Sequence, residues 1–348
     1  MKTPYSSYYL NGIAKGCKYC VKGRKLVLFI SGKCSRSCWY CSLSEKRKNK
    51  DIIWANEREI KNTKQLIQES KESQAKGAGI TGGDPLLFLS RTLKFASSLK
   101  KEFGKKFHIH IYLPTKLVSK SNLKKLSKYI DEVRFHPEFI LNKETISKDI
   151  EKINLASLFF KKKNIGIELP MIPDKKQEIL EFIKRTSKDV GFINLNEFEI
   201  SDTNFKIISS KYNLNEDTYT ISGSREAGLW IINQLNKLKI KNNVHFCTAC
   251  LKNNYQYKNR LKLHNILPYG RKTSEGTVMY LALYFKDITI QLKDFKNKFK
   301  GYHIDEKGQR IILSESLAKK LINQGFKVAR VEEHPTSDST VMDLCWLN

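Results

Sequence analysis

Residues 26–41 read LVLFISGKCSRSCWYC, and they decide the fold because an apolar strand runs directly into a cysteine-rich loop. The apolar run at residues 26–30 is typical of a strand that is covered on both faces. The loop that follows holds Cys34, Cys38 and Cys41 in a Cys-x3-Cys-x2-Cys pattern. Three thiols at the end of a buried strand predict a metal or redox site at that edge of the sheet.

The chain beyond this stretch alternates between short apolar runs and amphipathic segments. Expected strands lie at residues 77–81, 107–113, 132–135, 165–169, 192–195 and 244–246. Expected helices lie at residues 61–76, 91–103, 121–129, 148–163 and 176–188. Strand–helix repeats with apolar strands predict an α/β fold with a parallel sheet, a partial or full TIM-type (β/α) barrel. In such barrels the site lies at the carboxyl ends of the strands.

The pattern changes near residue 262. A basic helix is expected at residues 252–263, and apolar runs separated by glycines follow at residues 280–285, 288–292, 310–313 and 326–334. These runs predict a small β-rich C-terminal domain. We therefore expect three parts, an N-terminal Cys-x2-Cys segment at residues 1–24, the barrel domain at 25–262 and the β-rich domain at 263–348.

The composition excludes several classes of protein. The 348 residues are 40% hydrophobic, and they contain no apolar run of about 18 residues, so neither a disordered chain nor a membrane span is expected. No apolar block of signal-peptide type occurs near the N-terminus, and we expect a soluble, cytoplasmic protein. Lys and Arg number 63 against 35 Asp and Glu, a net charge of +28, and Arg contributes only 12 of the 63. A charge made mostly of Lys favours a nucleic-acid partner only modestly.

Three thiolates on one tight loop can each bind a different iron of a [4Fe–4S] cluster. Such clusters are normally held by four cysteines, so a missing fourth thiolate leaves one iron open to another ligand. Tyr40 stands between the second and third cysteine and would cover the cluster loop. A zinc site is the alternative, although zinc sites more often use two separated cysteine pairs.

This pattern resembles the radical S-adenosylmethionine (SAM) superfamily, in which the same cysteine spacing follows the first strand of a partial barrel. Within it, residues 16–260 resemble an archaeal-type branch described as related to pyruvate formate-lyase activating enzyme. The stretches that carry this resemblance, besides the cysteine motif, are KGAGITGGDPLL, FHIHIY, EVRFHP, NLNEFE and VHFC.

The resemblance implies a reaction. The open iron would bind SAM, and one electron from the cluster would cleave SAM to methionine and a 5′-deoxyadenosyl radical that abstracts a hydrogen from the substrate. Because the cofactor supplies the difficult chemistry, no catalytic side chain is assigned. An electron donor of the ferredoxin or flavodoxin type is expected as a partner.

The resemblance also implies which residues bind SAM. Residues 80–85 (ITGGDP) are similar to the superfamily's Gly-Gly-Glu-Pro motif, with Asp84 in the place where Glu is commoner. Glycine carbonyls at this turn would accept hydrogen bonds from the SAM ammonium group, since glycine allows close backbone approach. The expected SAM-binding residues are Tyr40, Gly82, Gly83, Asp84, Arg134, His136, Glu168, Asn194 and Asn196.

Two histidines alternate on the expected strand at residues 107–113, so His108 and His110 face the same side of the sheet. Both could be hydrogen-bonded core histidines. Alternatively, both could face the substrate in the barrel interior together with Glu197, which lies at the end of a later strand.

Two further cysteine pairs flank the barrel. Cys17 and Cys20 precede its first strand, and Cys247 and Cys250 follow its last. Two such pairs can form a four-cysteine zinc site or can hold an auxiliary iron–sulfur cluster, and zinc is slightly favoured. Cys345 stands alone, and a buried thiol is the simplest expectation for it.

Three functions compete. The favoured one is a radical SAM enzyme that modifies RNA, most of all tRNA, because the basic segment at residues 252–260 is interleaved with tyrosines that could stack on bases. The alternative is a protein- or peptide-directed enzyme of the activating type, which would abstract a hydrogen from a glycine or a similar residue. A non-enzymatic zinc protein that binds nucleic acid is the third.

Overall fold

The computed structural model describes residues 1–216, 219–287 and 292–347, and the chain forms two compact units. The first unit comprises Met1–Lys71 and Ala75–Tyr257. The second comprises Glu72–Gln74 and Lys258–Asn348. Within the described ranges, every helix is too short or too polar to span a bilayer.

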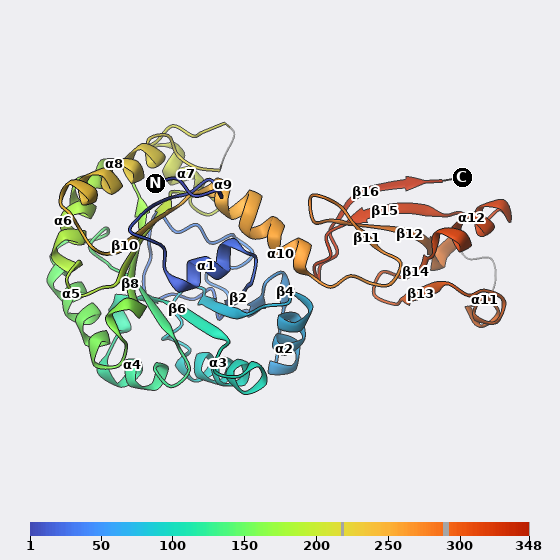
Figure 1. The fold of residues 1–348 in the computed structure, drawn as a ribbon, viewed down its shortest axis with the longest axis horizontal. Helices are drawn as coiled ribbons and strands as arrows, with labels where there is room; N and C mark the ends of the chain where they lie inside the picture. The colour runs from blue at the N-terminus through green and yellow to red at the C-terminus, as the bar shows by residue number, and fades with distance from the viewer. Residues whose placement is uncertain (217–218, 288–291, 348) are drawn as a thin grey trace. The chain divides into compact units, whose positions relative to one another are not determined.

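The first unit is built on one twisted sheet whose central seven strands are parallel (Figure 1). In spatial order these strands are β2 (Lys25–Phe29), β5 (Gly77–Thr81), β6 (His108–Pro114), β7 (Glu132–His136), β8 (Ile165–Met171), β9 (Phe192–Glu197) and β10 (Asn243–Cys247). All seven expected strands are therefore present. Spatial order follows chain order because each strand returns beside its predecessor through a crossover.

The sheet does not close into a full barrel. Strand β1 (Tyr8–Leu10) adds antiparallel to β10 at one edge, and β3 (Trp54–Ala55) with β4 (Arg58–Glu59) adds antiparallel beside β2 at the other. Over the described residues the strand order is linear, from β1 to β4. Of the two expected forms, the structure is the partial barrel.

Helices cover the outside of this sheet, as Figure 1 shows. Helix α6 is typical, since its buried residues Ile179, Phe182 and Ile183 recur at the spacing of one helix face. The outer helices are α2 (Thr63–Glu72), α3 (Leu89–Phe103), α4 (Lys120–Leu126), α5 (Ile146–Asn154), α6 (Lys176–Thr186), α7 (Phe205–Ser209) and α8 (Ser224–Lys237). Short 3-10 turns are η1 (Thr115–Leu117), η2 (Lys143–Thr145), η3 (Leu155–Leu158), η4 (Lys162–Asn164) and η5 (Pro173–Lys175).

The inner face of the sheet is polar, in contrast to its outer face. On β6, Ile109, Ile111 and Leu113 are fully buried members of the hydrophobic core, whereas His108 and His110 point the other way. The alternation along FHIHIYL is thus the period of a strand with one apolar and one polar side. A polar interior needs hydrogen-bond partners, and it marks the side where a ligand can bind.

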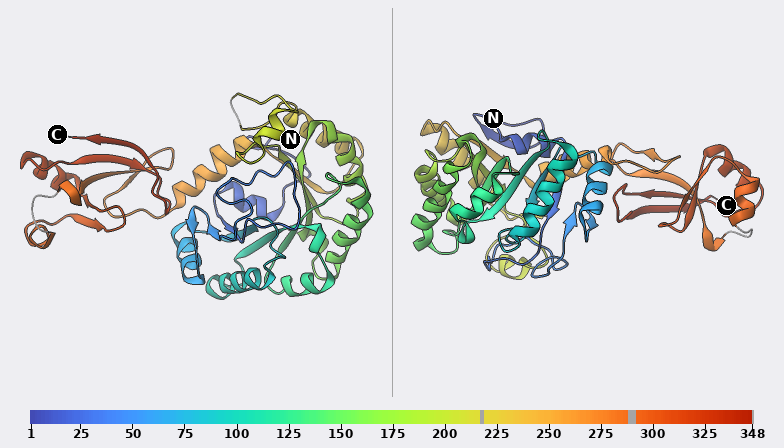
Figure 2. Two further views of the ribbon diagram at one scale, coloured as in Figure 1. Left: turned by 180° about the vertical axis from the view of Figure 1, so that it is seen from behind. Right: turned by 90° about the horizontal axis from the view of Figure 1, so that it is seen from below.

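Helix α1 (Lys15–Val21) lies inside the ring of strands (Figures 1 and 2). The backbone N–H of Gly16 donates to Glu132 Oε2 at 3.1 Å. A Cβ atom at Gly16 would lie 2.5 Å from Arg134 Nη2 and 2.7 Å from His110 Nδ1. Only glycine lets the helix approach the strands this closely. The N-terminal cysteine segment is therefore part of the barrel interior.

The chain leaves the sheet through a helical segment. After β10 come α9 (Ala249–Leu251), a π-helix η6 (Lys252–Tyr257) and α10 (Lys258–Leu263). The expected helix at residues 252–263 is confirmed, with a π-helical turn that the sequence pattern does not reveal.

The second unit holds an antiparallel sheet in the order β13-β14-β12-β15-β16, with β11 also paired to β12. Its elements are β11 (Arg271–Lys272), β12 (Val278–Tyr284), η7 (Phe285–Asp287), α11 (Leu292–Lys298), β13 (Tyr302–Asp305), β14 (Arg310–Leu313), α12 (Glu315–Asn323), β15 (Ala329–Glu333) and β16 (Val341–Trp346). A β-rich C-terminal part is thus confirmed. The run expected at residues 288–292 falls on residues 288–291, which lie outside the described residues.

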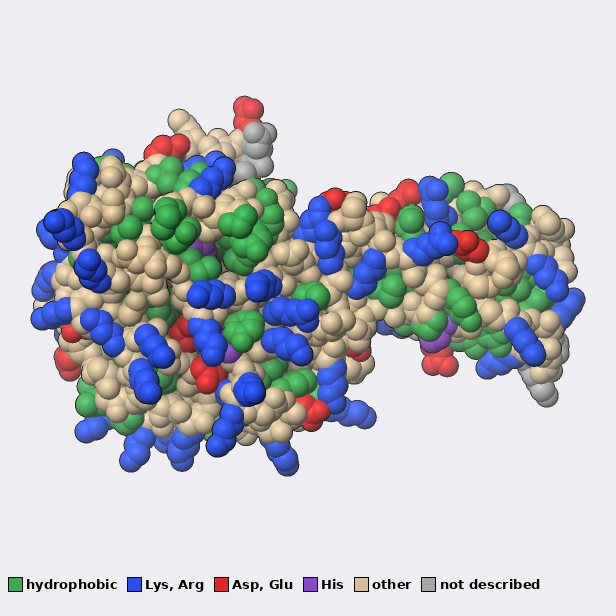
Figure 3. Space-filling view, in the orientation of Figure 1, with side chains coloured by type: hydrophobic (Ala, Val, Ile, Leu, Met, Phe, Trp, Pro, Cys, Tyr) green, Lys and Arg blue, Asp and Glu red, His purple; other side chains and the backbone are tan. Residues whose placement is uncertain are grey.

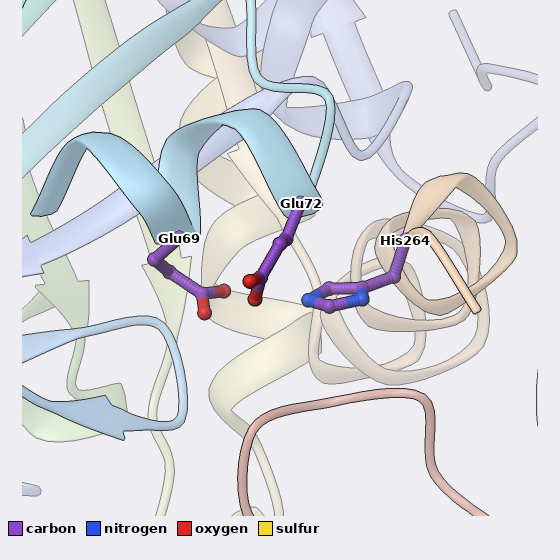
Figure 4. Close-up of side chains that lie close together, drawn as sticks. All are labelled: Glu69, Glu72 and His264. Carbon is purple, nitrogen blue, oxygen red and sulfur yellow. The ribbon is translucent and has the colours of Figure 1, made fainter. Parts of the chain in front are cut away.

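The short segment Glu72–Gln74 belongs to the second unit through contacts near the start of its main part. Asn265 N donates to the Glu72 carbonyl at 2.7 Å, and Gln74 Nε2 donates to Asn265 Oδ1 at 3.2 Å. Figure 4 shows the side chains of Glu72 and His264 close together. Glu69, one turn earlier on α2, accepts hydrogen bonds from Asn56 and Arg58, so its carboxylate is already satisfied.

Replacing Gly16 with valine should destabilise the first unit. The added atoms would collide with the Arg134 guanidinium, and such overpacking costs about 1–3 kcal/mol. Chemical denaturation of Gly16→Val and of Lys15→Ala, an exposed neighbour on the same helix, would measure the difference. Equal unfolding free energies for the two variants would contradict the placement of α1 inside the barrel.

Candidate functional site

A cavity of about 1070 Å³ lies within the first unit, on the inner face of the sheet. Small-molecule sites usually measure about 300–1,000 Å³, so this cavity has room for more than one bound group. Six cysteines line it, Cys17, Cys20, Cys34, Cys38, Cys41 and Cys247.

The cysteine loop, residues 31–50, is held at the carboxyl end of β5. Gly83 N donates to the Ser31 carbonyl at 2.8 Å, and Asp84 N donates to the Lys33 carbonyl at 3.0 Å. A Cβ atom at Gly83 would collide with the Lys33 carbonyl oxygen. The glycines of the GGDP turn are therefore required for the loop to dock, independently of any ligand.

Asp84 fixes the same loop through its side chain. Its Oδ2 accepts from Ser35 Oγ at 2.5 Å and its Oδ1 from Leu86 N at 2.9 Å. The carboxylate is buried, and Asp84 is not among the residues that line the cavity. The Asp84 oxygens thus hold the cysteine loop, and the contact of Asp84 with SAM stays a prediction.

The segment between β9 and α8 supports the loop from the other side. The Trp39 ring packs edge-on against Phe198 at 5.9 Å and stacks on Tyr212 at 6.4 Å. Thr203 Oγ1 donates to the Leu43 carbonyl at 2.6 Å. Two neighbouring parts of the fold thus fix the positions of the three cysteines.

Arg36 lies within the cysteine loop and lines the cavity. Its Nε and Nη1 are buried and have no hydrogen-bond partner within the part of the chain that the structure describes. The residue as a whole is partly exposed, but buried guanidinium donors without a partner are unfavourable unless an anion binds there. The loop residues therefore suit a negatively charged group, such as a thiolate-bound iron–sulfur cluster or the carboxylate of SAM.

An ion network crosses the interior beneath this loop. Arg134 Nε and Nη2 donate to Glu132 Oε1 at 2.7 and 2.5 Å, and Arg134 Nη1 donates to Glu168 Oε1 at 2.8 Å. Glu168 also accepts from Asn194 at 2.5 Å and from Asn196 at 2.8 Å. All the charged members are almost completely buried, and such groups persist only when each is paired in this way.

A buried lysine occupies the interior near β6. Lys25 Nζ lies 2.8 Å from His108 Nδ1 and donates to the Ala78 carbonyl at 3.0 Å. Burial lowers the pKa of Lys25 to about 7, and burial followed by the Lys25 charge lowers the pKa of His108 to about 2. His108 does not line the cavity, unlike His110. The contact with Lys25 fits the interpretation of His108 as a hydrogen-bonded core residue, and its substrate contact stays a prediction.

Most of the predicted site residues do converge on the cavity. Ten line it, Tyr40, Gly82, Gly83, His110, Arg134, His136, Glu168, Asn194, Asn196 and Glu197. Burial lowers the pKa of His136 to about 3, so this ring is neutral near pH 7. Arg134 pairs with the carboxylates of Glu132 and Glu168, which makes it a residue that positions Glu168.

The two outer cysteine pairs do not have the spacing of a tetrahedral zinc site. Zn–S bonds of about 2.3 Å require thiols about 3.8 Å apart. Among the described residues, no three of the thiols of Cys17, Cys20, Cys247 and Cys250 lie within 4.8 Å of one another. This geometry does not support the expected preference for zinc over an iron–sulfur cluster. Cys345 is exposed on β16, contrary to the expected buried thiol.

Sequence reasoning missed several residues of the site. Lys25, Glu132 and Tyr112 occupy inward positions of β2, β7 and β6, and Lys252 pairs with Glu199 at 2.8 Å and lines the cavity. A charged residue inside an apolar strand, such as Lys25, is a signal that could have been used. Lys252 carried no such signal, because it lies in a run of surface-like basic residues.

Comparison with known proteins identifies the class. Residues 28–185 match the family model described as the radical SAM superfamily. A protein of Methanocaldococcus jannaschii described as a "putative glycyl-radical enzyme activating enzyme" is 40% identical over 277 residues, which cover 77% of this chain and 72% of that protein. The chain is thus a SAM-dependent iron–sulfur enzyme by class, and it belongs to the radical SAM superfamily. A non-enzymatic zinc protein is excluded.

Two solved structures also resemble the chain. One is a histidine-tagged form of anSMEcpe with bound AdoMet (15% identity, TM-score 0.39), and the other is native anSMEcpe with bound AdoMet and a peptide (15% identity, TM-score 0.38). Each match covers 62% of this chain. The chain spans 59% and 61% of the length of those structures.

Removing the Arg36 charge should weaken SAM binding without removing iron. A hydrogen bond to a charged group contributes about 1.5–3 kcal/mol, so Arg36→Gln should raise the Kd for SAM by roughly 10- to 100-fold. Anaerobic calorimetry on the iron-loaded protein would measure it. The exposed Arg330→Gln is the control, and an unchanged Kd in Arg36→Gln would rule out a contact between Arg36 and the SAM carboxylate.

Proposed function

We propose that this chain is an activating enzyme that removes a hydrogen atom from a glycine residue of a partner protein. The superfamily uses a [4Fe–4S] cluster and SAM. The observation that carries the proposal is the 40% identity, over most of the chain, to a protein described as a glycyl-radical enzyme activating enzyme. A protein partner is therefore favoured over RNA.

Cys34, Cys38 and Cys41 are the proposed ligands of the cluster. They line one cavity, and their loop is fixed from β5 and from the segment after β9. Arg36 in the same loop has two buried nitrogen donors, Nε and Nη1. When bound, the cluster and SAM supply the one-electron chemistry that cleaves SAM and removes the hydrogen atom. We propose that the electron comes from a donor of the ferredoxin or flavodoxin type.

SAM lies, in this proposal, against the inner face of the sheet. Tyr40, Gly82 and Gly83 contact it beside the cysteine loop, and the neutral His136 can exchange hydrogen bonds with its hydroxyl groups. Asn194 and Asn196 both donate to Glu168. The fixed Glu168 carboxylate therefore presents its remaining acceptor capacity to the cavity.

The interior protects a reactive intermediate because α1 fills part of the barrel. The helix contacts β2 and β6, and Gly16 seats it on the ion network. The space that α1 occupies is not available to water, and exclusion of water from a reacting site prevents side reactions. The remaining volume of about 1070 Å³ suits SAM together with a narrow loop that presents a glycine.

The basic, tyrosine-containing segment at residues 252–260 favoured RNA in the sequence, but its side chains give less support to RNA binding in the structure. Tyr255 packs edge-on against Tyr5 at 5.6 Å, and Lys252 is paired with Glu199, so these side chains are occupied within the protein. Figure 3 shows Lys and Arg side chains spread widely over the visible surface of the first unit. A dispersed Lys charge serves solubility as well as binding.

Anaerobic extract of the source organism tests the substrate class. Addition of iron-loaded enzyme, SAM and a reductant should produce the EPR doublet of a glycyl radical in a protein fraction. The Cys38→Ala variant serves as the negative control. Loss or gain of a modified nucleoside in RNA, without a protein radical, would favour the RNA-modifying function and overturn the proposal.

Substitution of the proposed cluster ligands should abolish SAM cleavage, whereas substitution of a cysteine elsewhere should not. Cys34→Ala, Cys38→Ala or Cys41→Ala should reduce reductive SAM cleavage below detection, because three thiolates are needed to leave one iron open. Chromatographic measurement of 5′-deoxyadenosine gives the rate. Cys345→Ala, which removes an exposed thiol far along the chain, should cleave SAM at the wild-type rate. Cleavage that persists in Cys38→Ala would refute the ligand assignment.

A further inference from the structure

A second set of thiols shares the cavity with the cysteine loop. Cys17 and Cys20 lie on α1 inside the barrel, and Cys247 ends β10. Cys250 lies on α9, immediately after that strand. The proposed SAM chemistry uses none of these four residues.

Long-range contacts bring the two cysteine pairs to the same end of the sheet. Strand β1 pairs with β10, with Tyr8 opposite Phe246. His245 Nε2 lies 3.0 Å from Ser7 Oγ, and Thr248 Oγ1 donates to the Ser6 carbonyl at 2.6 Å. The N-terminal segment is therefore fixed along β10 before it turns into α1, and α1 then contacts η6, which follows Cys250.

The surroundings of Cys17 suit a metal-bound thiolate. Arg134 Nη2 lies 3.4 Å and Asn194 Nδ2 3.5 Å from its sulfur, and both nitrogens can donate. Cys17 Sγ also lies 3.7 Å from Asn194 Oδ1, to which the neutral thiol can donate. The two nitrogen donors would complement the sulfur once a metal replaces its proton. Hydrogen bonds to cysteine sulfur are also a means by which proteins tune iron–sulfur clusters.

A zinc ion and a [4Fe–4S] cluster require different spacings of their four thiols. A single zinc ion would draw four sulfurs together, whereas a [4Fe–4S] cluster spreads them because each thiolate binds a different iron. No three of these thiols lie within 4.8 Å of one another among the described residues, and the same is true of Cys34, Cys38 and Cys41. Neither set thus has the close spacing that a single zinc ion requires.

We propose that Cys17, Cys20, Cys247 and Cys250 hold a second [4Fe–4S] cluster in the wall of the cavity. The four thiolates complete its coordination, so this cluster has no open iron and binds no SAM. It shares the cavity of the proposed function but does not depend on the identity of the substrate.

Iron analysis of a variant that lacks the cysteine loop ligands tests this directly. After anaerobic reconstitution with iron and sulfide, the wild-type chain should hold about eight irons, because each cluster holds four. The C34A/C38A/C41A variant should keep about four irons and a cluster signal in its reduced EPR spectrum. Cys17, Cys20, Cys247 and Cys250 are unchanged in this variant, so the second site keeps all four of its proposed ligands.

Two further variants complete the test. C247A/C250A should lose about four irons while the cysteine loop still binds its own cluster, and C345A should match the wild type. A loop variant that contains no iron, or that contains one zinc per chain, would overturn the second cluster. Absence of SAM cleavage by the wild-type chain would instead count against the proposed function. Failure of the second cluster and failure of the proposed function are therefore distinguishable.

Discussion

The ion network of Glu132, Arg134 and Glu168 is the constraint on which the rest of the first unit depends. It places three charges inside a barrel where unpaired charge would be very unfavourable. Because its members are mutually satisfied, the interior can remain polar and still be stable. Glu132 also accepts a hydrogen bond from the backbone N–H of Gly16 on α1. The same network therefore seats the helix that carries Cys17 and Cys20.

The cysteine loop depends on close backbone approach in a similar way. Gly83 admits the Lys33 carbonyl, and Asp84 binds Ser35 within the loop. The contribution of this turn is thus geometric, since it orients three thiols toward one cavity before any ligand binds. Preorganisation of this kind lowers the cost of binding a cluster and a cofactor. The short segment after β5 therefore contributes both to the fold and to the arrangement of the three cysteines.

Much of the fold could be predicted from local sequence patterns, because each strand and helix carries its own period. The seven parallel strands and Cys34, Cys38 and Cys41 follow from such patterns. The position of α1 could not be predicted, since it rests on contacts between Gly16 and residues more than a hundred positions away. The role of Asp84 in holding the cysteine loop could not be predicted for a related reason, since its partner Ser35 lies on a different strand–loop unit.

The central claim is that the enzyme, with its cofactors bound in this cavity, removes a hydrogen atom from a glycine residue of a protein. For the most direct measurement, cells are grown with deuterated glycine and an extract is prepared from them. The reconstituted enzyme is added with SAM, and the deuterium content of the released 5′-deoxyadenosine is measured. The account predicts deuterium transfer that is lost when the extract's proteins are digested by protease and retained when its RNA is removed by nuclease. Transfer that is abolished by nuclease and unaffected by protease would contradict it.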